Sequence, residues 1–115
     1  MIARNTKDSE SLEPYPEALT ERVRIFVYQY QSGQYDGNGE SLVLLKNGLW
    51  HRMGLGHCSC YGPLDEQNLS DLNCDGYSSL EELKSHWSPE LVAEMTPIYD
   101  IAKVLSMSVE PEAKA

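Results

Sequence analysis

Positive charge, cysteine and long apolar segments are all scarce in this sequence of 115 residues. Nine lysine and arginine residues stand against 18 aspartate and glutamate residues, so the formal net charge is −9. A chain this acidic is repelled by phosphate backbones, and we expect no direct binding to nucleic acid. No apolar run approaches the roughly 18 residues of a membrane span, so we also expect no membrane partner.

The three cysteines do not form the pattern of a secreted disulfide scaffold, because their number is odd. Cys58 and Cys60 are separated by one residue, which would strain a bridge between them. The first five residues lead into a polar stretch and not into the apolar segment of a secretory signal peptide. We therefore predict reduced thiols and a protein of the cytoplasm.

The order of strand-like and helix-like segments predicts a single α+β domain over residues 20–107. Strand patterns come first and helix patterns last, which favours a small antiparallel β-sheet of three to four strands packed by C-terminal helices. Residues 1–19 are polar and contain Pro14 and Pro16, and we expect them to form a flexible N-terminal arm. Residues 108–115 should form a flexible tail.

Two segments carry clear strand signals. Residues 22–30 alternate, with β-branched side chains on one face and mainly aromatic side chains on the other. The glycine-rich residues 31–40 are predicted to form a loop. Residues 41–46 and 49–53 flank Asn47-Gly48, which predicts a hairpin with a two-residue type I′ turn. In that register Leu45 pairs with Trp50, Leu44 pairs with His51, and His51 lies on the strand surface.

This hairpin carries apolar residues on both faces. Such a pattern indicates either a central position in a sheet or a partner that covers the second face.

Helical periodicity begins at Ser79, which together with Glu82 forms the capping-box pattern of a helix N-terminus. A second helix is predicted to start at Pro89 and to continue to about Ser106, with a kink or a new start at Pro97. The apolar stripe of the first helix consists of Leu80, Leu83 and Trp87.

Residues 71–82 match the twelve-residue calcium loop of EF-hand proteins and also resemble a dockerin-type loop. Aspartate or asparagine occupies the first, third and fifth positions, Gly76 the sixth and Glu82 the twelfth. Calcium prefers oxygen ligands from alternate positions of a tight loop. The sequence therefore predicts one Ca²⁺ site, whose ligands would be Asp71, Asn73, Asp75, the Tyr77 carbonyl, Ser79 through a water, and Glu82.

Three features weaken this match. Ser78 replaces the branched apolar residue that pairs two such loops, no second loop occurs in the sequence, and residues 63–70 are a poor helix. The alternative is a turn rich in aspartate and asparagine, followed by a helix that Ser79 caps. A single uncoupled site would be structural rather than sensory.

The cysteine-rich segment permits two further interpretations. His57, Cys58, Cys60 and Cys74 could bind Zn²⁺, although structural zinc sites favour longer Cys-Cys spacing. Alternatively, Cys58 or Cys60 could be a catalytic thiolate, but no third group that would orient a base is evident. The histidines that could activate such a thiolate are His51, His57 and His86. We favour the simpler interpretation, in which small cysteine side chains pack under the sheet.

The segment Gly56-His57-Cys58-Ser59-Cys60-Tyr61-Gly62, together with Tyr35-Asp36-Gly37 and the Asn-Gly hairpin, resembles a group of small tailed-phage proteins. The similarity covers residues 23–87. Asp36 replaces the usual glutamate, and the stretch 62–79 is longer here, so the resemblance does not extend to the calcium-like loop. It implies a phage protein that acts in the host bacterial cytoplasm.

These observations predict a small acidic phage accessory protein that binds and modulates a host protein, without enzymatic activity. Host takeover and inhibition of a host defence both fit this function. The alternatives are a single-site calcium-binding module and a cysteine-dependent enzyme. The predicted contacts with the partner are Tyr35, Trp50, Arg52 and Tyr61.

Overall fold

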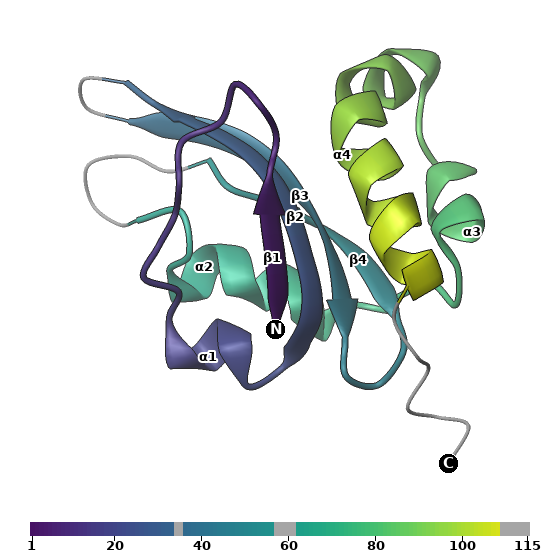
Figure 1. The fold of residues 1–115 in the computed structure, drawn as a ribbon, viewed down its shortest axis with the longest axis horizontal. Coiled ribbons are helices and arrows are strands. Elements are labelled where there is room, and N and C mark those ends of the chain that lie inside the picture. Colours follow the sequence, from purple (N-terminus) through teal and green to yellow (C-terminus); the bar gives the residue numbers. More distant parts are fainter. Residues whose placement is uncertain (34–35, 57–61, 109–115) are drawn as a thin grey trace.

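The computed structural model describes residues 1–33, 36–56 and 62–108 (Figure 1). Four strands form one sheet in the order β1-β2-β3-β4. The strands are β1 Ile2–Asn5, β2 Val23–Ser32, β3 Gly37–Leu45 and β4 Trp50–Gly54. The helical segments are α1 Glu17–Thr20, α2 Glu66–Leu69, the 3-10 helix η1 Ser70–Asn73, α3 Leu80–Lys84 and α4 Pro89–Ser108. This architecture confirms the predicted α+β class.

The sheet separates two hydrophobic cores, because β2 and β3 are apolar on both faces. In β2, Ile25 and Val27 face α3 and α4, whereas Phe26 and Tyr28 face the opposite core. Figure 1 shows α3 and α4 on one side of the sheet and α1 and α2 on the other. The chain itself therefore covers the second apolar face of the hairpin. Within the described residues, no helix combines the length and apolar character that crossing a membrane requires.

The turn between β3 and β4 differs from the predicted type I′ turn by one residue. Leu44, not Leu45, pairs with Trp50. The Gly48 N–H donates to the Leu45 carbonyl at 2.9 Å. Gly48 has a φ of +88°, and no other residue among those described has a positive φ. A type I′ turn needs positive φ at both central residues, so this loop is a type I turn followed by a glycine bulge.

Residues 31–32 and 37–40 lie in the two strands of a second hairpin and not in the predicted loop. β2 continues to Ser32 and β3 begins at Gly37, and Tyr30 pairs with Gly39. A Cβ atom on Gly39 would lie 2.3 Å from the backbone oxygen of Gln29. The glycine that suggested a loop is thus required by the close approach of two strands.

The N-terminal residues correct the prediction of a flexible arm. Ile2–Asn5 form β1, which pairs in parallel with β2, so the sheet is mixed rather than wholly antiparallel. The chain then returns over Tyr28, whose hydroxyl accepts a hydrogen bond from the Leu12 N–H at 3.0 Å and lies 3.1 Å from the Tyr15 hydroxyl. Backbone hydrogen bonds hold much of this segment in place. Such bonds do not depend on the side chains, so the pattern of apolar residues in the sequence does not reveal them.

The predicted helix starts are confirmed. The Ser79 hydroxyl accepts a hydrogen bond from the Glu82 N–H at 3.1 Å and caps α3. The Ser88 hydroxyl accepts a hydrogen bond from the Leu91 N–H at 3.2 Å at the start of α4. α4 continues as one helix through Pro97.

Candidate functional site

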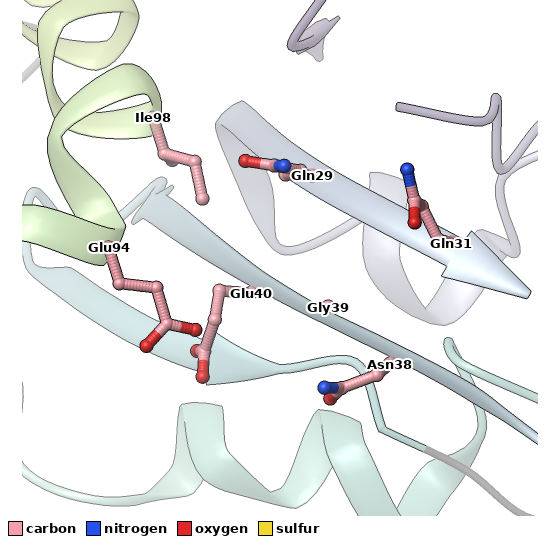
Figure 2. Close-up of a pocket in the computed structure, with 7 residues that line it drawn as sticks. All are labelled: Gln29, Gln31, Asn38, Gly39, Glu40, Glu94 and Ile98. Carbon is pink, nitrogen blue, oxygen red and sulfur yellow. The ribbon is translucent and has the colours of Figure 1, made fainter. Parts of the chain in front are cut away.

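The sheet face beneath α4 changes from apolar to polar along β2 and β3. In β2, Ile25 and Val27 are followed on the same face by Gln29 and Gln31, because residues two apart in a strand share a face. In β3 the polar residues come first and the apolar residues follow. α4 packs on the apolar half, and a cavity of about 240 Å³ lies at the boundary. Its lining, drawn in Figure 2, consists of Gln29, Gln31, Asn38, Gly39, Glu40, Glu94 and Ile98.

Glu40 is the residue of this cavity with the most unusual environment. Its Oε2 atom accepts a hydrogen bond from the Arg52 guanidinium at 2.7 Å. Its Oε1 atom is buried and has no hydrogen-bond partner. Burial raises the pKa of this carboxyl, the contact with Arg52 opposes the increase, and the charges of Glu94 and Asp71 add to it. A half-buried carboxylate with one enclosed, unpaired oxygen is unfavourable for folding, so a positive charge placed beside it would be stabilising.

The remaining walls of the cavity also present acceptors. The Gln31 amide nitrogen donates to the Asp8 carbonyl at 3.1 Å, which leaves the side-chain oxygen of Gln31 free to accept. Glu94 reaches toward the Glu40 end of the cavity from α4 (Figure 2). Ile98, which is almost fully buried, lies at one edge of the cavity, and Gly39 contributes backbone to the lining. The cavity is therefore suited to a positively charged hydrogen-bond donor.

The first half of the calcium-like loop is engaged in the fold. Asp71 and Asn73 lie in η1. An Asp71 carboxylate oxygen accepts a hydrogen bond from the Gly54 N–H at 3.3 Å, and the Asn73 side-chain oxygen accepts one from Arg22 at 3.0 Å. Asp75 is exposed to solvent.

The second half of the loop is engaged as well. The Tyr77 carbonyl accepts a hydrogen bond from the Trp50 N–H at 2.7 Å, in an isolated β-bridge. Ser79 caps α3, and the Glu82 carboxylate accepts a hydrogen bond from the Ser78 hydroxyl at 3.0 Å. Among the residues that the structure describes, no group of three or more His, Cys, Asp or Glu side chains could hold a metal ion. Calcium binding stays a prediction of the sequence pattern.

The zinc and thiolate hypotheses depend mainly on His57, Cys58 and Cys60, which lie outside the described residues. Cys74 is described; it is a free cysteine and is exposed, so packing under the sheet does not account for it. The His86 ring is exposed and contacts the Tyr77 ring at 4.8 Å between centroids.

The predicted partner contacts divide into three groups. Tyr35 and Tyr61 lie outside the described residues. Trp50 is 5% exposed and belongs to the core beneath α3 and α4, so its side chain does not offer a binding surface. Arg52 is exposed and lies beside the cavity through its pair with Glu40.

His51 is buried rather than on the strand surface as predicted, with 4% of its surface exposed. The corrected register places His51 opposite Val43, on the sheet face that carries the core of Phe26 and Tyr28. Its Nε2 atom is buried without a hydrogen-bond partner. Burial lowers the pKa of His51, the charge of Arg22 acts in the same direction, and a hydrogen bond with the Asp71 backbone opposes both.

The environment of His51 predicts a loss of stability in mild acid. In the unfolded chain a histidine has its ordinary pKa of about 6.5. In the folded chain the pKa of His51 is lower, so the unfolded state binds more protons as the pH falls below about 6.5. The free energy of unfolding should be fully retained above that pH and should fall as the pH approaches the lowered pKa.

Urea unfolding measured between about pH 7.5 and 5.5 tests this expectation. The variant His51→Phe should show a weaker dependence on pH in this window, while the exposed His86→Gln should behave like the wild type. Equal pH dependence in His51→Phe and the wild type would contradict the assignment.

Sequence reasoning missed the cavity because residues 31–40 looked like a loop. A signal was present, since the alternation of residues 22–30 becomes polar at Gln29 on the face that carries Ile25 and Val27. Comparison with known proteins adds no further constraint: no protein-family model matches the sequence, and no curated protein or solved structure was found to be similar to the chain.

Proposed function

We propose that this chain is a small acidic accessory protein, without enzymatic activity, that binds a basic surface of a partner protein. The observation that carries the proposal is the cavity lined by amide and carboxylate side chains beside Glu40, whose carboxylate has only one hydrogen-bonded oxygen. The net charge of −9 would attract a basic partner over distances longer than any single contact.

The nature of the partner is proposed from the sequence. The resemblance to small tailed-phage proteins favours a host bacterial protein as the partner. Modulation of that protein would then serve host takeover or the inhibition of a host defence.

Affinity capture from a bacterial host lysate, quantified by mass spectrometry, tests the proposal. The wild type should enrich specific proteins, and the double variant Glu40→Gln/Glu94→Gln should reduce their enrichment by about tenfold or more, because charged contacts in an interface are costly to remove. Raising the salt concentration should weaken the same interactions.

The matched control is the double variant Glu17→Gln/Glu90→Gln, which also removes two charges, from exposed positions in the first turns of α1 and α4. This variant should capture the same proteins as the wild type. The proposal fails if the wild type enriches no protein, and the role of the cavity fails if the double variant captures the same proteins equally well.

A further inference from the structure

We infer that the Glu40 cavity binds the guanidinium group of an arginine side chain, in preference to the ammonium group of lysine. This inference deepens the proposed function and depends on it for the identity of the partner as a protein. The chemistry of the cavity itself can be tested without any partner.

The first argument is the unpaired acceptor. Glu40 already receives one guanidinium, because Arg52 donates to its Oε2 atom at 2.7 Å. The other oxygen, Oε1, is buried and has no hydrogen-bond partner. A buried acceptor that lacks a donor carries the desolvation cost of burial without its compensation. Because Oε1 is fully enclosed, a cation in the neighbouring cavity offsets this cost through its charge beside the carboxylate and not through a direct hydrogen bond to Oε1.

The second argument is the local charge. Glu40 experiences the negative charges of Glu94 and Asp71 and the positive charge of Arg52. These four side chains together carry a net charge of −2, with three carboxylates against one guanidinium. A bound cation would therefore reduce the repulsion among the carboxylates, although Arg52 is close by.

The third argument is the direction of the acceptors. Acceptor side chains reach the cavity from β2, β3 and α4 and so surround a ligand on several sides (Figure 2). Guanidinium is planar, presents five N–H donors and sheds its hydration more easily than ammonium does. Lysine offers three donors from one atom, which suits fewer of these acceptors at once. The side chains that can accept are Gln29, Gln31, Asn38, Glu40 and Glu94.

The fourth argument is size and polarity. The cavity volume of about 240 Å³ is below the roughly 300 Å³ at which drug-sized ligands are usually held. It suits the end of one side chain. Ile98 lies at one edge of the cavity but is almost fully buried, so the polar side chains supply most of the surface that a ligand would contact.

The test is an NMR titration of the ¹⁵N-labelled protein with three probes: the N-acetyl methylamides of arginine, lysine and citrulline. Citrulline has the shape of arginine but a neutral urea group. We expect arginine to shift the amide resonances of residues 38–40 and 94–98. Lysine should bind at least about fivefold more weakly, and citrulline should give no saturable shift, because both lack part of the charged fork. Equal binding of arginine and citrulline would overturn the inference.

Variants connect the binding to the cavity. Glu40→Gln should weaken arginine binding about tenfold, whereas Glu90→Gln should leave it unchanged. If Glu40→Gln does not fold, Glu94→Gln gives the same test at an exposed position of α4. Binding that survives both changes would overturn the inference.

The two proposals can fail separately. If arginine binds and capture of host proteins does not depend on Glu40, the inference stands and the cavity has no role in the partner complex. If arginine gives no saturable shift, the inference is wrong, whatever the capture experiment shows.

Discussion

Replacing Trp50 with alanine should lower the free energy of unfolding by about 3–5 kcal/mol. The indole is 5% exposed and packs between the sheet and the helices α3 and α4. Removing it leaves a cavity that the surrounding side chains can fill only in part. A loss of this size is a large share of the roughly 5–15 kcal/mol that stabilises an ordinary domain. Urea unfolding followed by circular dichroism measures it.

Arg52→Ala is the matched control, because Arg52 follows Trp50 on the same face of β4 but is exposed. Loss of its hydrogen bond to the half-buried Glu40 carboxylate should cost about 1–2 kcal/mol, which is well below the loss expected for Trp50. If Trp50→Ala unfolds at the same urea concentration as Arg52→Ala, then Trp50 does not contribute to the core. A role in partner binding would then become the better explanation for its presence.

Replacing Gly76 with alanine should cost about 1–3 kcal/mol, in the absence of any metal. The added Cβ atom would lie 2.6 Å from the His51 Nε2 atom and 2.8 Å from the Leu49 Cβ atom. Gly76 does not have the positive φ found at Gly48, so conformational freedom is not the reason for a glycine here. The glycine at the sixth position of the calcium pattern is explained by its packing on His51.

This experiment also tests the calcium hypothesis. Unfolding of Gly76→Ala should be measured both with a chelator and with added calcium, and the loss should be the same in both. Gly54→Ala is the control, because a Cβ atom there would meet no atom within 4 Å. A variant that matches the wild type with chelator but is destabilised in calcium would show that the loop holds the ion.

The α+β class and the two faces of β2 follow from side-chain alternation, which is a direct consequence of burial. Alternation predicted that Ile25 and Val27 face away from Phe26 and Tyr28, and the structure confirms it. The same alternation was wrong for Val23, which joins the core of Phe26 because a register shift separates it from Ile25. The N-cap at Ser79 is similarly local, because a hydroxyl and a nearby N–H are sufficient to form it.

The register of the β3–β4 hairpin was not predictable in the same way. Asn47-Gly48 suits a type I′ turn, and Gly48 also suits the glycine bulge that is observed. The choice between the two depends on which core receives Trp50. The observed register places it opposite Leu44, on the face that α3 and α4 cover, and a slip of one residue would change its partners.

The candidate site was hidden for a related reason. Gly39 has low strand propensity, and only the three-dimensional approach of the Gln29 backbone explains why glycine is required there. Once β2 and β3 are extended through this region, Gln31 and Glu40 reach the same sheet face. No local pattern brings Glu94, which is distant in sequence, to that face.

The parallel pairing of β1 has a consequence for the order in which the chain assembles. β2, β3 and β4 follow one another through short connections, whereas Ile2 must find Ile25 across the whole segment between them. Closing that longer span costs chain entropy before its contacts form. We therefore expect the first 16 residues to close last during folding and to open first in the native state. Their opening would set the rate at which water reaches Phe26 and Tyr28, while the core beneath α4 stays closed.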